Sequence, residues 1–275
     1  MAKGKEVAKV TEEPKAIQGS GYAADAGAGF EDTTSKDYAL PFLGILQKGS
    51  PQVDPDQDAY IEGAKAGQVF NTVTGDRYDG DKGIIFIPVH HEHKYVEWIP
   101  RDLGGGFVGL HAPDSPEVLK AREDAGTDFG KLPFGDNQLA ETFYMYGIRV
   151  DADGNTEQCV IAFASTQIRA YKAWMTKARG IKLRDDNDRP FPAPLFAHRY
   201  RLSTNLQENK KGKWHGWRIG FDGTSASEAR IPVDDPLYEE AKGLRELVMS
   251  GLAKLDFDKQ NLGGEEVEES SQKSF

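Results

Sequence analysis

Residues 83–101, GIIFIPVHHEHKYVEWIPR, are rich in Ile, Val and aromatic side chains and predict a long β-strand. Pro88 has no backbone N–H to donate to a neighbouring strand, so the strand either bends or divides at Pro88 or at the histidines. This strand opens the part of the chain whose sequence pattern is regular enough to predict a fold.

Two hairpins and a helix follow the long strand. ETFYMYGIRV (141–150) and EQCVIAFAS (157–165) predict two strands joined by the turn DADGN. FAHRYRLSTN (196–205) and KWHGWRIGFDG (213–223) predict a second pair, joined by LQENKKG. Between the hairpins, STQIRAYKAWMTKARG (165–180) predicts a helix with Ile168, Tyr171, Met175 and Ala178 on its apolar stripe.

A long bent strand, a hairpin, a helix and a second hairpin follow one another as the strands of an OB fold do. We therefore expect an α+β, mainly β fold: an OB-like five-stranded barrel with a helix between strands 3 and 4. Extra N-terminal elements and a C-terminal helix at 236–255, capped by Asp235, would complete it. The same order of elements also suits other α+β folds.

The composition predicts three regions. Residues 1–35 mix Ala, Gly, Lys and Glu with few large apolar residues and predict a disordered arm. Residues 36–255 would form a single OB-like domain with insertions, including a short helix at 115–126. Residues 256–275 become polar and acidic and predict a disordered tail.

Several classes of protein are disfavoured by the sequence. No apolar run approaches the ~18 residues of a membrane span, and the first residues contain no apolar stretch of a secretion signal. The single cysteine, Cys159, excludes an internal disulfide and a thiolate-rich zinc site. We expect a cytoplasmic protein that has no membrane partner and needs no cofactor.

The charge is distributed unevenly along the chain. The whole chain has a formal charge of −10, which alone argues against a nucleic-acid partner. Residues 160–220, however, contain thirteen Lys or Arg against four Asp or Glu, together with three of the four tryptophans. This block predicts either a basic aromatic binding surface or a solvated basic face balanced by acidic neighbours.

Cations that contact phosphates and flat rings that stack on bases are what binding to single-stranded nucleic acid requires. In the last hairpin, strand alternation assigns Trp217, Ile219 and Phe221 to the core and Trp214 and Arg218 to the open face. Each tryptophan taken alone could equally belong to the core. The predicted stacking residues are Trp214, Trp174, Tyr200, Trp98 and Tyr95, and the predicted phosphate contacts are Arg169, Lys172, Arg199, Arg201, Lys211, Lys213 and Arg218.

Other chemistries are less well supported. His90, His91 and His93 suggest a metal, but in a strand at most two of them share a face and a third ligand must come from elsewhere. The run Asp185–Asp188 could bind a divalent ion, although a surface turn before Pro190 is simpler. No catalytic motif is present, so we expect neither an enzyme nor a bound metal.

The chain ends in GGEEVEESSQKSF, an acidic segment with a terminal aromatic residue. With the OB-like strand order and the basic aromatic block, this ending resembles the single-stranded DNA-binding proteins of bacteriophages. The segments DYALPFLGILQKGSPQV (37–53) and AYKAWMTKARG (170–180) are also similar to a phage protein group with that role. The chain departs from the resemblance at 270–274, where SSQKS separates the acidic residues from Phe275.

The resemblance implies a tail that competes with DNA for the basic surface and recruits replication or recombination proteins. The residues involved would be Glu265, Glu266, Glu268, Glu269 and Phe275. A plain solubilising terminus is the simpler alternative for this segment.

The prediction is a non-enzymatic protein that coats and protects single-stranded DNA in the host cytoplasm during phage replication, recombination or repair. The alternative is a phage structural or decoration protein with no nucleic-acid role. The sequence leaves open whether the chain forms a homo-oligomer, prefers DNA to RNA, or anneals strands.

Overall fold

The computed structural model describes Asp25, Ala28 and Gly29, and then residues 39–125, 131–210, 212–253 and 255–260. The predicted long strand is one continuous element, β4 (Ile84–Ile99), which pairs antiparallel with β7 (Asn137–Val150). The register shifts between Pro88 and His90, so the predicted bend is a β-bulge. Its cause is local, because Pro88 cannot donate a hydrogen bond to the ladder.

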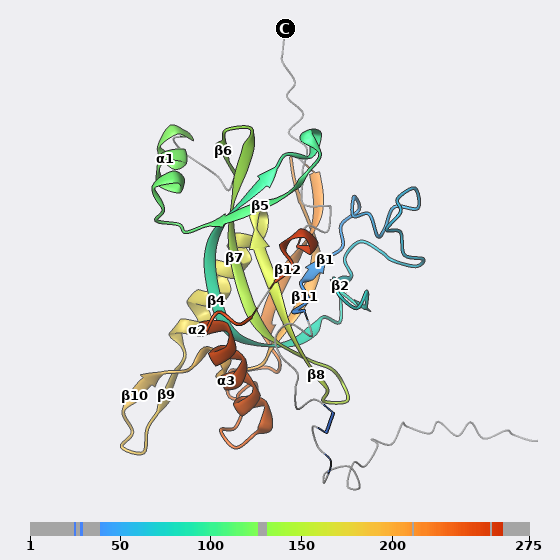
Figure 1. The fold of residues 1–275 in the computed structure, drawn as a ribbon. Coiled ribbons are helices and arrows are strands. Elements are labelled where there is room, and N and C mark those ends of the chain that lie inside the picture. The colour runs from blue at the N-terminus through green and yellow to red at the C-terminus, as the bar shows by residue number, and fades with distance from the viewer. Residues whose placement is uncertain are drawn as a thin grey trace, which may run out of the picture. The chain divides into compact units, whose positions relative to one another are not determined.

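The β4–β7 pair is the centre of a seven-stranded antiparallel sheet (Figure 1). Near the start of β4, the pair is flanked by β11 (Tyr200–Asn209) on one side and β8 (Thr156–Ala164) on the other. Near the end of β4, it is flanked by β5 (Gly106–His111) and β6 (Lys131–Phe134). The edge strand β12 (Gly212–Phe221) pairs with β11, so both predicted hairpins are confirmed.

Two small sheets accompany the large one. β1 (Leu43–Ile45), β2 (Val69–Asn71) and β3 (Arg77–Tyr78) form a three-stranded sheet. β9 (Lys182–Arg184) and β10 (Pro190–Pro192) form a hairpin of their own. The sequence patterns at these positions are too short to have predicted them.

The three predicted helices are present as α1 (Pro116–Ala125), α2 (Ile168–Gly180) and α3 (Pro236–Met249). α3 ends at Met249, before the predicted end at residue 255. The side chain of Asp235 accepts a hydrogen bond from the backbone N–H of Leu237 at 2.9 Å, as expected of the cap of α3. Short 3₁₀ turns lie at Arg101–Leu103, Ser165–Gln167, Leu195–Ala197 and Phe257–Lys259. No helix in the described part of the chain is long and apolar enough to cross a bilayer.

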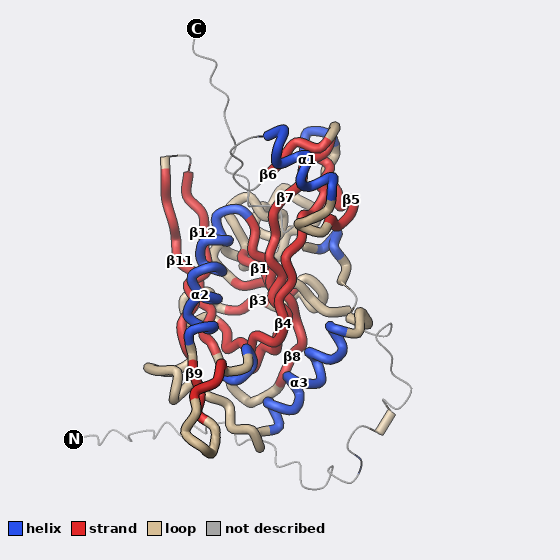
Figure 2. The backbone as a smooth tube through the Cα atoms, turned by 90° about the vertical axis from the view of Figure 1, so that its left-hand side faces the viewer, coloured by secondary structure: helices blue, strands red, loops and turns tan. Residues whose placement is uncertain are grey.

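Apolar cores lie on both faces of the large sheet. On one face, α2 packs against the sheet, including its β11–β12 hairpin, with Phe86, Trp174 and Trp217 among the buried residues. On the other face, α3 covers the sheet and buries residues such as Tyr146 and Leu244. Figure 2 shows the two helices on opposite sides of the strands. Each fully buried side chain of this size contributes roughly 1.5–3 kcal/mol.

The strand pairings follow the predicted order, but β8 and β12 share no ladder in the described part of the chain. The N-terminal segment reaches both strands. The N–H of Val160 in β8 donates to the carbonyl of Pro41 at 2.9 Å. The side-chain amide of Gln47 exchanges two hydrogen bonds, of 2.9 and 2.8 Å, with the backbone of His215 in β12. An α+β, mainly β fold is therefore confirmed, while direct closure of a five-stranded barrel is not observed.

The C-terminal segment continues beyond the predicted domain end at residue 255. The ring of Phe257 stacks on Phe107 with centroids 4.9 Å apart and also contacts Tyr144. The hydroxyl of Tyr144 donates to the side chain of Gln260 at 2.6 Å. The packed chain thus extends to Gln260, because Phe257 completes the core above the sheet. Apart from the described residues in each, the predicted disordered regions 1–35 and 256–275 lie outside the described chain.

Candidate nucleic-acid interface

The exposed face of α2 carries four cations and no anion. Arg169, Lys172, Lys177 and Arg179 are all solvent-exposed, and no Asp or Glu occurs between Ser165 and Arg184. None of the four forms an ion pair with a described residue. Arg169 and Lys172 repel one another as neighbours three residues apart, and Arg169 lies in the first turn, at the positive end of the helix dipole. This arrangement costs stability unless an anion binds there.

Lys172 stands beside a stack of aromatic rings. The ring of His93 stacks on Phe143 with centroids 4.2 Å apart, and Phe143 stacks on Tyr171 at 4.6 Å. The ammonium of Lys172 lies 5.4 Å from the centre of the Phe143 ring. The stack fixes the base of the Lys172 side chain on a rigid surface, because all three rings are supported by the sheet or the helix.

The histidines of β4 favour the neutral state in this setting. Burial lowers the pKa of His93, while the nearby carboxylate of Glu141, at 3.0 Å, opposes that shift. Lys172 and Arg122 lower the pKa of His93 further. Burial likewise lowers the pKa of His90 and of His91. The positive charge of this surface near pH 7 therefore comes from Lys172 and Arg122.

The outer face of the β11–β12 hairpin presents a second polar surface. Trp214 and Arg218 lie on it as predicted, opposite Gln207 and Ser203 of β11. Gly216 lies between Trp214 and Arg218 along β12. The side-chain amide of Gln207 fills the position that a Cβ atom at residue 216 would take. Trp214 is half-buried, and its indole N–H has no hydrogen-bond acceptor among the described residues. Arg218 is exposed and has no ion-pair partner in the same part of the chain.

Three other predicted cations at this hairpin, Arg199, Arg201 and Lys213, are paired. Arg201 and Arg199 both face Asp222, with nitrogen–oxygen distances of 2.7 and 3.8 Å. Lys213 lies 3.1 Å from Glu208. The Lys213–Glu208 pair is solvent-accessible and contributes only about 0–1 kcal/mol, so a phosphate could replace Glu208 at little cost. The Asp222 side chain is only 14% exposed, so its displacement from Arg199 and Arg201 would leave a buried carboxylate unpaired.

Three predicted stacking residues belong instead to the core, which corrects the sequence prediction. Trp174, Tyr200 and Tyr95 are only 3%, 3% and 2% exposed, so no base can reach their faces in this conformation. The sequence held a signal for Trp174, which lies three residues after Tyr171 and four before Ala178, on the apolar stripe of α2. Trp98 is half-buried and packs edge-on against Phe107 at 5.9 Å. Its stacking role is equally unsupported.

Some predicted residues lie outside the described chain. They are Lys211 and the tail residues Glu265, Glu266, Glu268, Glu269 and Phe275. Conversely, the sequence reasoning missed Arg122, which approaches His93 from α1, and the exposed ring of Phe191 in β10. Nothing in the local sequence at Arg122 indicated that α1 would pack beside β4.

The described residues contain no group of three or more His, Cys, Asp or Glu side chains placed to hold a metal ion. In the Asp185–Asp188 run, Asp188 pairs with Arg184 and Asp185 pairs with Arg189, at 3.0 and 2.8 Å. These carboxylates stabilise a surface turn, which is the simpler of the two predicted roles.

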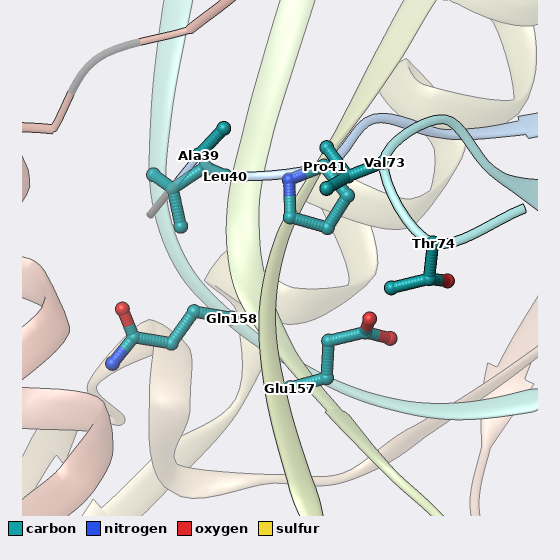
Figure 3. Close-up of a pocket in the computed structure, with 7 residues that line it drawn as sticks. All are labelled: Ala39, Leu40, Pro41, Val73, Thr74, Glu157 and Gln158. Carbon is teal, nitrogen blue, oxygen red and sulfur yellow. The ribbon is translucent and has the colours of Figure 1, made fainter. Parts of the chain in front are cut away.

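A cleft of about 280 Å³ lies between the N-terminal segment and β8 (Figure 3). Leu40, Val73 and Glu157 are among the residues that line it. The carboxylate of Glu157 accepts hydrogen bonds from Asn71, Tyr78 and Arg149, so it is not free to act on a ligand. Burial, followed by the Glu157 charge, raises the pKa of Tyr78 to about 12. Through these hydrogen bonds, Glu157 in β8 joins the large sheet to the three-stranded sheet that contains Asn71 and Tyr78.

Comparison with known proteins assigns the chain to a family. Neither the curated proteins nor the solved structures gave a match. The family model of the Pam3 phage gp34-like protein matches residues 10–254, which is most of the chain. The match includes α2, the β11–β12 hairpin and α3, and so covers the whole candidate interface. The chain therefore belongs to the Pam3 phage gp34-like protein family and is a bacteriophage protein.

Proposed function

We propose that this phage protein binds single-stranded DNA without catalysing a reaction, and coats and protects it during replication, recombination or repair. The observation that carries the proposal is the cationic face of α2, which has four exposed cations and no ion-pair partner among the described residues. A positively charged surface without ion-pair partners favours the binding of a polyanion, because each phosphate contact releases condensed counterions.

The hairpin supplies the second component. Trp214 offers a partly exposed ring beside Arg218, and a stacked base contributes roughly 1–3 kcal/mol without demanding a particular sequence. We therefore expect binding that depends weakly on sequence and strongly on salt.

The order of strand pairing supports an OB-like arrangement, with the segment 41–47 standing between β8 and β12. OB folds commonly bind oligonucleotides on the face of strands 2 and 3, which correspond to β7 and β8. Here α3, Phe42 and Phe257 cover that face. The proposed DNA path therefore uses α2 and the outer face of the β11–β12 hairpin instead.

The acidic end of the chain has a proposed role in recruiting partners. Glu265, Glu266, Glu268, Glu269 and Phe275 would bind replication or recombination proteins once DNA displaces the tail from the basic surface. The packing of Phe257 and Gln260 shows where a truncation must end, so the tail should be removed after Asn261.

Fluorescence anisotropy of a labelled oligo-dT tests the proposal at low and moderate salt, with the full chain and with a chain ending at Asn261. We expect tight binding that weakens with salt and strengthens without the tail. If neither protein binds at low salt, single-stranded DNA binding is wrong. If both bind equally, the competing role of the tail is wrong.

A phage structural or decoration protein is the second candidate, and β5 favours it. Val108 and Leu110 are exposed on this short edge strand, and Leu103 is exposed just before it. Exposed apolar edge strands are sites of association between chains. Light scattering of the nucleic-acid-free protein distinguishes the candidates: ordered assembly that Val108→Lys abolishes would favour the structural role.

A further inference from the structure

The β9–β10 hairpin is an appendage that begins directly after α2. Its strands pair with one another and with no other strand of the described chain. Figure 1 shows the hairpin projecting from the end of α2, away from the large sheet. Most of its side chains are exposed, so it contributes little to either core.

The hairpin is nevertheless held in one conformation. Arg184 pairs with Asp188 and Arg189 pairs with Asp185 across the turn. The Asp185 carboxylate also accepts the backbone N–H groups of Asn187 and Arg189, both at 2.9 Å. Pro190 and Pro192, with fixed φ angles, flank the central residue of β10. A projecting element is thus stiffened although it buries little apolar surface.

That central residue is Phe191, whose side chain is 39% exposed. Among the Phe, Tyr and Trp side chains of the described residues, only one other is exposed, and it is Tyr60 in a loop. Phe191 shares a face with its cross-strand partner Leu183. Lys182 and Arg184 lie opposite Pro192 and Pro190 and occupy the other face. The hairpin therefore has one face with the Phe191 ring and an opposite face with Lys182 and with Arg184, which is paired with Asp188.

The hairpin also extends the row of cations that runs along α2. Lys177 and Arg179 lie in the last turn of the helix, and Lys182 follows two residues after the helix ends. The helix has thirteen residues and is about 20 Å long, which is enough to follow several phosphates of a single strand. A strand bound along α2 would reach the hairpin at the C-terminal end of the helix.

We infer that the β9–β10 hairpin is part of the DNA interface and that Phe191 stacks on a base of the bound single strand. This inference rests on the function proposed above and adds a stacking residue to it. The Asp–Arg pairs and the two prolines hold the hairpin, and with it the Phe191 ring, in one conformation before DNA binds. Little conformational entropy is therefore lost on binding.

The test compares wild type with Phe191→Ala, Phe191→Tyr and the matched control Tyr60→Ala, which removes the other exposed ring. Affinity for oligo-dT is measured by anisotropy, and circular dichroism verifies folding. We expect Phe191→Ala to weaken binding about 5- to 140-fold. Phe191→Tyr and Tyr60→Ala should remain close to wild type.

A second oligonucleotide separates stacking from charge. An abasic strand of the same length keeps the phosphates but has no bases, so Phe191→Ala and wild type should bind it equally. If wild type binds oligo-dT and Phe191→Ala binds it as tightly, the stacking inference is wrong while the proposed function stands. If wild type fails to bind oligo-dT, the proposed function fails, and the inference fails with it.

Discussion

At the scale of single residues, Trp214 is the predicted stacking side chain that the fold leaves accessible. It lies on the outer face of β12, and its half-buried ring is not part of either apolar core. Trp174 and Trp217, by contrast, are buried within one core. We expect Trp214→Ala to lower affinity for oligo-dT by about 5- to 140-fold, the value of one stacked base.

The measurement for Trp214 is anisotropy, with circular dichroism and thermal unfolding as controls for folding. A variant that remains folded and binds as tightly as wild type would remove Trp214 from the interface.

Four histidines make the stability of the fold dependent on pH. Burial lowers the pKa of His90, His91, His93 and His198 below the ordinary value near 6.5. The unfolded chain therefore binds protons at a higher pH than the folded chain does. The stability that this difference supplies is complete above about pH 6.5 and is lost as the pH falls through the folded-state values.

Urea unfolding at pH 7.5 and 5.5 measures this dependence. We expect a lower free energy of unfolding at pH 5.5, and a smaller decrease in His93→Gln, which has one titrating group fewer. An equal free energy at the two pH values would contradict the lowering of these pKa values.

At the scale of elements, the charges at the start of α2 make this helix less stable than its apolar packing alone would make it. Arg169 lies in the first turn, where a positive charge opposes the helix dipole, and three residues before Lys172. Arg169→Gln should therefore raise the free energy of unfolding by about 0.3–1 kcal/mol while it weakens DNA binding.

Denaturant unfolding and oligo-dT titration of the same Arg169→Gln preparation test this trade-off. A variant that is less stable than wild type would show that Arg169 supports the fold rather than a ligand site.

The sequence predicts the elements whose patterns are long. β4, the two hairpins and the three helices follow from periodicity, turn residues and the cap at Asp235. The short strands β1, β2, β3, β9 and β10 do not, because two or three residues are too few to show an alternating pattern. Contacts between distant segments are a second reason. Gln47 illustrates the point, since its amide completes the edge of β12 from 168 residues away in the sequence. No local pattern encodes that contact.

In the candidate site, too, the residues that a long helix or strand pattern assigns to a face are predictable, and tertiary packing is not. Helical and strand periodicity placed Arg169, Lys172, Trp214 and Arg218 on exposed faces, and they are accessible or partly so. Tyr200 and Tyr95 were misjudged because a ring on one face of a strand is exposed only if nothing packs there. α2 covers Tyr200, whose ring contacts Trp174 at 5.2 Å, and Tyr95 lies in the core formed with α1. That information belongs to the tertiary structure.

At the scale of the whole molecule, the C-terminal segment as far as Gln260 is part of the fold. Phe257 packs against Phe42, Phe107 and Tyr144, which come from three distant parts of the chain. We expect Phe257→Ala to lower the free energy of unfolding by about 1–3 kcal/mol, because the ring is partly buried. Urea unfolding measures the loss, and a change below a few tenths would contradict this packing.

The distribution of charge over the whole molecule gives the most direct test of the central claim, that α2 binds single-stranded DNA. The double variant Lys177→Gln/Arg179→Gln removes two cations from α2. Its matched control, Lys242→Gln/Arg245→Gln, removes two exposed cations from α3 on the opposite side of the sheet.

The measurement is the slope of log affinity for oligo-dT against log salt concentration for wild type and both variants. For a single strand, the slope becomes shallower by about 0.7 for each phosphate that the protein no longer neutralises. We predict a slope shallower by up to about 1.4 and weaker binding for the α2 variant, with the α3 variant close to wild type. Equal slopes for all three proteins, or a shallower slope in the α3 variant than in the α2 variant, would contradict the placement of DNA on α2.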